Sequence, residues 1–286
     1  MININTYMSS LSSQQIGTSK NILQIQTVQI APFRTLMTAL KDILLETNIS
    51  FTPDGIKIIN MDKSHTILAH LSLNAKNFEH YECSQPKIVI GVNMFHLFKL
   101  INTIDNDDTL TIYIEEDDYT DGIVQYLGLK FENGDIKQQK IQKLRLIEPE
   151  TDELEVPDVK FSSVLNLPSS DFQKIIRDLS CISDKIEIKS VATSEGAELI
   201  FKCSGGFAQA EVRRAESDGS MEYIIKQDNS KIIQGEFSLK NLSYFIKCTN
   251  LCSSIEIYLE NDLPLVVKYN VASLGEIKLC LAPLPS

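Results

Sequence analysis

Basic side chains recur in four short segments of the sequence whose apolar residues have the spacing of amphipathic helices. In the first segment, Arg34 and Lys41 lie opposite an apolar face that repeats every three or four residues from Phe33 to Leu44. The other three segments share this plan and carry their basic residues at Lys99, Lys174, Arg177, Lys240 and Lys247. Such groups can attract phosphate without reading a base sequence. The segments therefore predict a surface for a nucleic-acid backbone, although charge alone is equally typical of a solvated helix face.

Residues for catalysis or metal binding form no recognisable pattern. The four histidines lack the spacing of a helical zinc pair, and Cys248 and Cys252 fit a protein core better than a metal site. The acidic runs at 105–108 and 115–121 do not fit a calcium loop, and no Gly-x-Ser-x-Gly motif is present. We therefore expect no catalytic residue, no metal and no cofactor. A metal-dependent nuclease or phosphoesterase that uses the acidic runs is the enzyme alternative.

The composition of the 286-residue chain favours an intracellular, soluble protein. No apolar run is long enough to span a membrane, and no signal peptide opens the chain, so we expect no membrane partner. The net charge of -11 opposes nucleic-acid binding if it is spread evenly. The acidic residues, however, gather in connecting segments such as 105–108, 115–121 and 148–158. This segregation permits one positive face on a negative body.

An internal duplication organises the chain. The first and third helical segments, like the second and fourth, are separated by roughly 140 residues, which indicates two similar halves. Many short strand-like segments, from 22–30 to 276–281, lie between only two helices per half. This pattern predicts an α+β fold of two similar domains, each with antiparallel sheets and helices packed on one face. The predicted divisions are a disordered extension at 1–21, domains at 22–143 and 159–286, and a connector at 144–158.

The connector has an unusual composition, with two prolines and six acidic residues between 144 and 158. Proline disfavours both a helix interior and a central strand. Its few apolar residues predict an extended segment that crosses a surface rather than a free tether, and long connectors of this kind are commonly functional.

Six segments together resemble the eukaryotic-type DNA sliding clamps, the family of proliferating cell nuclear antigen. They are Ala39–Leu44, Met61–His65, Gly91–Asn93, Ile176–Ser180, Leu263–Tyr269 and Leu281–Pro283. Each is weakly specific, but their order and spacing run through nearly the whole folded part. The resemblance implies the DNA clamp fold, closed by three identical subunits into a ring that is threaded by duplex DNA and tethers replication and repair enzymes.

The same resemblance implies which residues face the DNA. They are Arg34, Lys41, Lys99, Lys174, Arg177, Lys240 and Lys247. Thr35 and Asn102 stand where the family often has further basic residues, so the inner charge is expected to be thinner in this chain.

A second implied site is a hydrophobic pocket under the connector. In the family it receives a short helical peptide with aromatic residues and a leading glutamine, the PIP box, carried by DNA polymerase, clamp loader and other partners. The matching positions are Met61, His65, Leu68, Leu154, Val156, Pro157, Pro264, Ala282 and Pro283. Cys280 occupies a position that is usually tyrosine, which is expected to change the pocket's shape and preference.

Subunit contacts in such a ring are implied for the edge strands at 137–147 and 206–214. Both are rather basic, so nearby acids such as Glu211 must compensate in a homotrimer. Alternatives are a monomeric processivity factor with the same fold, a checkpoint-type clamp or one member of a heterotrimer. We expect the nucleus as the compartment, with a cytoplasmic viral replication site as the alternative.

Overall fold

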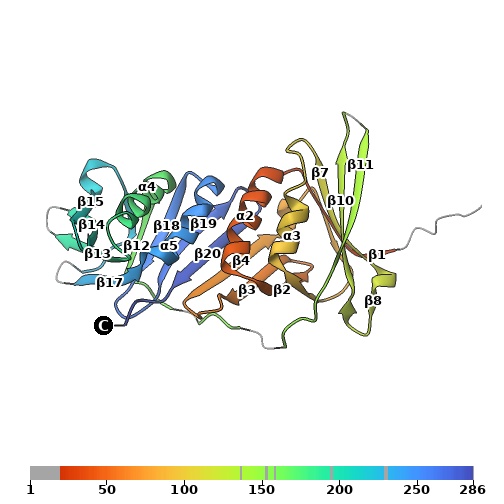
Figure 1. Ribbon diagram of the computed structural model, residues 1–286, viewed down its shortest axis with the longest axis horizontal. Coiled ribbons are helices and arrows are strands. Elements are labelled where there is room, and N and C mark those ends of the chain that lie inside the picture. The colour runs from red at the N-terminus through yellow and green to blue at the C-terminus, as the bar shows by residue number, and fades with distance from the viewer. Residues whose placement is uncertain are drawn as a thin grey trace, which may run out of the picture.

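The computed structural model describes residues 20–135, 137–151, 154–157, 159–193, 196–228 and 231–285. Three antiparallel sheets and one small hairpin form the architecture, with helices across one face (Figure 1). The α+β fold with antiparallel sheets predicted from the sequence is therefore confirmed. Most of the predicted disordered extension, residues 1–19, lies outside the described residues, and Asn21 already belongs to a strand.

The largest sheet has nine strands and joins the two halves of the chain. Its order is β16 (Glu222–Ile225), β12 (Ser163–Pro168), β18 (Ser254–Leu259), β19 (Leu265–Val271), β20 (Gly275–Leu281), β4 (Ile67–Asn74), β3 (Gly55–Met61), β2 (Glu46–Thr52) and β6 (Ile88–Asn93). The junction is the antiparallel pair β20 and β4, which runs in register from Gly275 opposite Leu73 to Leu281 opposite Ile67. The halves therefore share backbone hydrogen bonds as well as side-chain packing.

Smaller sheets lie at the two ends of the molecule. The first half has a five-stranded sheet in the order β11 (Gln138–Arg145), β10 (Tyr126–Asn133), β7 (Thr109–Glu115), β1 (Asn21–Thr27) and β5 (His80–Cys83). The second half has a four-stranded sheet in the order β15 (Gln209–Ala215), β14 (Gly196–Ser204), β13 (Lys185–Thr193) and β17 (Ile232–Ser238). The hairpin pairs β8 (Tyr119–Thr120) with β9 (Ile123–Val124).

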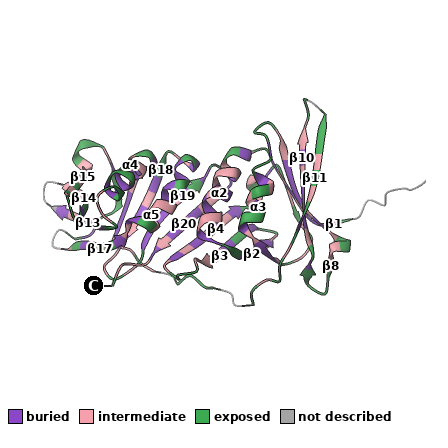
Figure 2. Ribbon diagram, viewed as in Figure 1, coloured by how far each residue is buried: buried purple, intermediate pink, exposed green. Residues whose placement is uncertain are grey.

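The four predicted helices are present, with their apolar faces buried. They are α2 (Ile30–Ile43), α3 (Met94–Ile101), α4 (Ser169–Ser180) and α5 (Leu239–Phe245). Single-turn 3₁₀ helices occur at η1 (Ala75–Asn77), η2 (Glu116–Asp118) and η3 (Glu216–Asp218). Exposed residues lie on the outer side of the helices, whereas much of the nine-stranded sheet behind them is buried (Figure 2).

Two differences from the predicted boundaries concern the helices. The strand expected at 22–30 ends at Thr27, whose hydroxyl accepts a hydrogen bond from the Gln29 backbone N–H at 3.0 Å, and Ile30 begins α2. The fourth helix continues after Phe245 as a 3₁₀ helix, η4 (Ile246–Leu251). Tighter winding changes the direction of each later side chain, so the seven-residue spacing from Lys240 to Lys247 does not keep both on one line.

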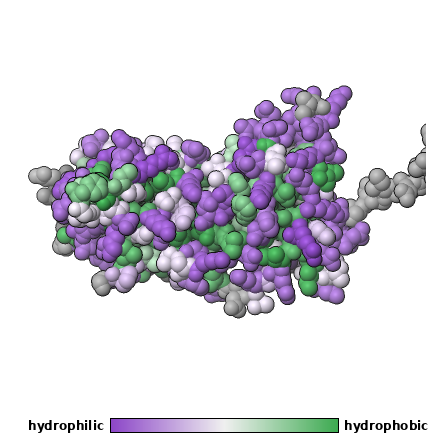
Figure 3. Space-filling view, viewed as in Figure 1, coloured by the Kyte–Doolittle hydropathy of each residue, from purple (hydrophilic) through white to green (hydrophobic). Residues whose placement is uncertain are grey.

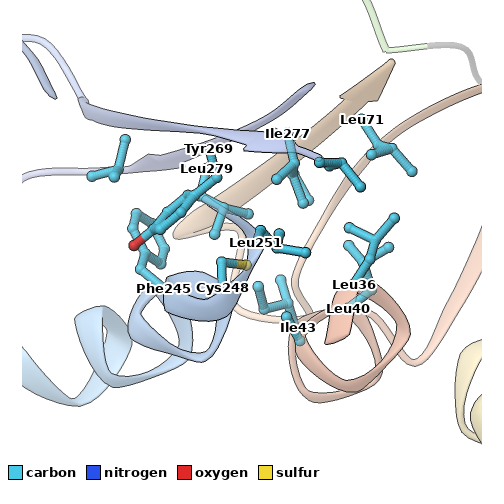
Figure 4. Packing of buried hydrophobic residues seen from close by; sticks show 14 of the residues in the cluster. Leu36, Leu40, Ile43, Leu71, Phe245, Cys248, Leu251, Tyr269, Ile277 and Leu279 are labelled. Atoms are coloured by element: carbon cyan, nitrogen blue, oxygen red, sulfur yellow. The ribbon is translucent and has the colours of Figure 1, made fainter. Parts of the chain in front are cut away.

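Buried side chains from both halves form one continuous core between the helices and the nine-stranded sheet. Figure 4 shows Leu36 and Leu40 of α2 close to Leu251 of η4, with Ile277 and Leu71 on the sheet above them. Cys248 is fully buried here, as predicted for a core residue. Because the core crosses the junction between the halves, the position of α2 relative to η4 is set by packing as well as by the sheet.

The connector is held against the edge of the nine-stranded sheet at its start. The Ile147 backbone N–H donates to the Gly91 carbonyl at 3.0 Å, and Asn48 exchanges two hydrogen bonds with the Glu150 backbone at 2.7 and 3.0 Å. A Cβ at Gly91 would lie 2.6 Å from the Ile147 carbonyl oxygen, so only glycine permits this approach. The described part of the connector is an extended segment on a surface, as its composition predicted, although β11 continues to Arg145, two residues into it.

Candidate nucleic-acid interface and peptide pocket

The four helices form one row on a single face of the molecule. Helix α2 contacts α3 on one side and η4 on the other, and α4 contacts both α5 and η4. Figure 1 shows all of them in front of the sheets. Hydrophilic side chains cover much of this face, with apolar patches between them (Figure 3). We call this surface the helical face.

The charge of the helical face is opposite to that of the whole chain. Its five helical segments contain seven basic residues, which are those predicted to face DNA, and three acidic residues, Asp42, Asp171 and Asp178. The difference is a formal charge of +4 on a chain whose net charge is -11. The segregation that the sequence permitted is therefore present in the folded chain, and it creates a local attraction for polyanions.

Four of the predicted residues extend into solvent. Lys174, Arg177 and Lys240 are exposed and form no ion pair within the described part of the chain. Lys99 is also exposed, and its Nζ lies 4.5 Å from the centre of the Phe95 ring. Long side chains that form no ion pair can meet phosphates at variable positions, because no acidic partner must be displaced.

The other three residues have partners of their own. Asp42 binds Lys41 at 2.8 Å and also pairs with Lys247, so one carboxylate joins α2 to η4. Burial acts to raise the pKa of Asp42, but the hydrogen bonds from Lys247 and Lys41 outweigh it and hold the pKa below its usual value. Arg34 donates to Asn106 at 3.1 Å and to the Ile104 carbonyl. Its guanidinium therefore positions the loop after α3 and is less available to a ligand.

The predicted pocket lies on the opposite face of the nine-stranded sheet. Its floor crosses five strands in register, from Met61 through Leu68, Cys280 and Val266 to Tyr258. These side chains alternate with the buried ones that pack under the helices, so strand periodicity assigns them to the other face. The pocket has a volume of about 460 Å³, and the connector residues Val156 and Pro157 form one wall.

Seven of the nine residues predicted for this pocket line it. They are Met61, His65, Leu68, Val156, Pro157, Pro264 and Ala282. Leu154 lies instead in a neighbouring hollow of about 430 Å³ that shares Met61 and His65 with the pocket. Pro283 lines a third hollow on the other side of the C-terminal segment, because successive residues of an extended segment point in opposite directions.

Sequence reasoning missed the aromatic wall of the pocket. The rings of Phe161 and Tyr258 meet edge to face, with centroids 5.5 Å apart, and both line the pocket. Tyr258 alternates with buried residues on β18, and this alternation was the available signal for the face to which it points. Cys280 lies on the floor as predicted, and burial raises the pKa of its thiol to about 11, so it is protonated and apolar in character.

A rigid turn carries His65 at the rim of the pocket. His65 has a φ of 54°, an uncommon value for a residue other than glycine. The Asp62 carboxylate supports the turn by accepting backbone hydrogen bonds from Thr66 at 2.8 Å and Ile67 at 2.7 Å. Burial raises the pKa of Asp62, but bonds from Ser64, Ile67 and Thr66 outweigh it and lower the pKa overall. The rim is therefore formed before any ligand arrives.

The outermost strands β11 and β15 lie at opposite ends of the molecule (Figure 1). Lys143 of β11 pairs with Asp118 at 2.9 Å and with Glu115. On β15, Arg213 pairs with Glu211 at 2.7 Å and with Glu198 at 3.3 Å, and Arg214 lies 3.5 Å from Asp171. These basic residues are thus compensated within their own chain.

Two kinds of site are not seen in the described ranges. No group of three or more His, Cys, Asp or Glu side chains is placed to hold a metal ion there. No helix there is both long enough and apolar enough to cross a membrane.

Known proteins match the chain over nearly its whole length. Models of the N-terminal and C-terminal domains of proliferating cell nuclear antigen match residues 22–153 and 155–284. The probable DNA polymerase sliding clamp 1 of Paramecium bursaria Chlorella virus 1 is 31% identical over 266 residues, which cover 93% of this chain and 98% of that protein. The probable DNA polymerase sliding clamp of Acanthamoeba polyphaga mimivirus is 34% identical over 230 residues, covering 80% of this chain but 47% of the viral protein.

Replacing Asp42 by Asn tests the electrostatics of the helical face. The change removes one negative charge and frees Lys41 and Lys247. Duplex DNA should then bind about three- to tenfold more tightly in low salt, with a steeper salt dependence, as measured by fluorescence anisotropy. The control is Glu222→Gln, an exposed acid on β16, which should leave both quantities unchanged. Unaltered or weaker binding by D42N with an unchanged unfolding temperature would contradict this assignment.

Proposed function

This chain belongs to the proliferating cell nuclear antigen family of DNA polymerase sliding clamps, and from that premise we propose that three copies close into a ring around duplex DNA. As a sliding clamp it is a processivity factor, which keeps a polymerase on its template. One observation carries the proposal: a row of helices with a formal charge of +4 covers one face of a chain whose net charge is -11. In the ring, this helical face would line the hole.

Weak contact with DNA that slides through the ring suits exposed side chains such as Lys99, Lys174, Arg177 and Lys240. Long flexible cations attract phosphates without selecting bases, so the clamp binds no position along the duplex much more tightly than another. Retention then comes from encirclement rather than from affinity. Lys41 and Lys247 contribute less while they share Asp42, and Arg34 supports the loop after α3.

Ring closure would pair β11 of one copy with β15 of the next. Both are the last strands of their sheets, and a closed three-fold ring removes two exposed edges per copy. Lys143 on β11, and Arg213 and Arg214 on β15, already have acidic partners in their own chain, which lowers the repulsion expected from the sequence. On β11, Ile141 is 57% exposed and offers apolar surface to a neighbour. A heterotrimer with related subunits and a monomeric processivity factor are the alternatives.

The pocket between the sheet and the connector would bind the PIP-box peptides of DNA polymerase, clamp loader and repair enzymes. Its apolar floor, aromatic wall and preformed rim suit a short helical segment with aromatic anchors. The clamp would have no catalytic activity of its own. Because the two relatives described above are viral, we favour a viral replication site over the nucleus as its place of action.

Neutralising the unpaired cations of the helical face tests the DNA contact. Changing Lys174, Arg177 and Lys240 together to Ala should shorten the products of the cognate polymerase and lower the salt slope of DNA binding by up to about 3. Assembly should be intact by light scattering. The control changes Lys20, Lys76 and Lys202, exposed lysines outside the helical face, the pocket and the neighbouring hollow, and should behave as the parent. Parental product lengths from the first variant would refute the inner-face assignment.

Mass in solution tests ring closure. The parent should have three times the chain mass of 32.2 kDa. Ile141→Asp places a charge on the β11 edge and should shift the protein towards monomer at micromolar concentration. Ile232→Asp introduces the same charge at a residue of similar exposure on β17 and should remain trimeric. A parent that stays monomeric would favour the monomeric factor.

Connector variants test the pocket. Val156→Asp should weaken binding of a fluorescent PIP-box peptide by at least about tenfold, because it puts an unpaired charge in an apolar wall. Leu154→Ser should have a smaller effect, since Leu154 lies in the neighbouring hollow. Equal losses for both variants, or none for V156D, would move the peptide site elsewhere.

A further inference from the structure

Beside the apolar floor of the pocket, a second row of side chains crosses the same strands. This row is two residues away from the floor residue on each strand. His70 of β4 lies opposite Lys278 of β20, which lies opposite Lys268 of β19, and Lys268 lies opposite Glu256 of β18. Because side chains two residues apart point to the same face, this polar row runs directly along the apolar one. His70 and Lys278 also line the pocket.

The pocket has a charge of one sign. Among the described residues that line the pocket, Lys278 is the one with a formal charge at neutral pH, and none of these residues is acidic. The neighbouring hollow, which shares Met61 and His65, is lined instead by Glu46, Asp62 and Glu150 together with Lys63. Along the groove formed by the two hollows, the potential therefore changes from negative near the start of the connector to positive at Lys278.

Cations outnumber anions around Lys278. Its Nζ lies 3.3 Å from Glu276, which is also 3.3 Å from Lys268. Lys268 is in turn 3.0 Å from Glu256. Two lysines thus share Glu276, and Lys57 adds a third positive charge near His70.

The lysines near His70 also act on its pKa. Burial lowers the pKa of His70, and the charges of Lys278 and Lys57 lower it further against an opposing effect of Glu276. The imidazole is therefore neutral at pH 7, although it lies where an added negative charge would favour its protonated form.

We propose that the pocket selects peptides that place an acidic residue beside their aromatic anchors, with the carboxylate on Lys278 and His70. This inference rests on the proposed peptide-binding function. The acidic lining of the neighbouring hollow repels the same carboxylate, so the two ends of the groove also set the direction in which the peptide lies. The apolar floor supplies affinity through the anchors, and the charged row supplies discrimination.

Proton uptake is the signature that distinguishes this arrangement from a general surface attraction. A bound carboxylate favours the imidazolium form, so the pKa of His70 is higher in the complex than in the free clamp. Binding of an acidic peptide should therefore tighten as the pH falls from about 7.5 to about 5.5. Protonation of the peptide carboxylate acts in the opposite direction only near its own, lower pKa.

The experiment uses synthetic peptides with a leading glutamine and two aromatic anchors. A single Glu is moved through each remaining position, and each peptide is compared with its Gln counterpart by fluorescence anisotropy on the full chain. At one position, Glu should bind about three- to tenfold more tightly than Gln at low salt. Lys278→Met should abolish this preference while the Gln peptide still binds. His70→Gln should abolish the increase of the Glu preference at low pH.

A matched variant guards against a nonspecific charge effect. Lys160→Met removes the same charge from an exposed residue that lines neither hollow, and it should leave the preference for Glu intact. If Gln and Glu peptides bind equally well at every position, or if K278M keeps the preference, the inference is overturned although the peptide site stands. If no peptide binds the parent at all, the proposed peptide-binding function falls with it.

Discussion

The pairing of β20 with β4 is the constraint on which the rest of the structure depends. It joins the last strand of the second half to the first half, so that nine strands form one sheet with two different faces. Ile277 and Leu279 point to the core beneath the helices, whereas Lys278 and Cys280 point to the pocket. A slip of one residue would exchange these sets and bury a charge, so the hydrophobic pattern fixes the register. The same pairing sets α2 beside η4, and so completes the helical face.

The two faces of the nine-stranded sheet differ in charge and polarity. Most acidic residues lie outside the helical face, which leaves this face positive and the rest of the chain negative. Solvated lysines suit weak and exchangeable contacts with a phosphate backbone, as we propose for this face. Asp42 moderates the surface further by engaging Lys41 and Lys247. The pocket on the other face offers apolar area and shape instead, with Lys278 as the charged residue among its described lining.

Much of this arrangement was predictable from sequence, but not all of it. Helical periodicity predicted the four buried faces, because packing requires apolar residues at three- and four-residue steps. It did not reveal the 3₁₀ winding of η4 or the partners of Arg34, which depend on tertiary contacts. Strands β2 and β10 were not predicted, although the sequence carries their signal: Ile49 and Phe51 in β2, and Leu127, Leu129 and Phe131 in β10, alternate with polar or small residues. The resemblance located seven residues of the pocket. Alternation along β18 gives the face to which Tyr258 points, but its place in the pocket also requires the strand order that brings β18 beside β19.

Encirclement is the central claim, and retention on closed DNA tests it most directly. Clamps loaded by their cognate loader onto a nicked circular duplex should stay bound through gel filtration in moderate salt. They should be released when a restriction enzyme linearises the circle, because a ring can leave only over an end. Equal retention on circular and linear DNA would show that contacts rather than topology hold the protein. That result would contradict a ring lined by the basic helices.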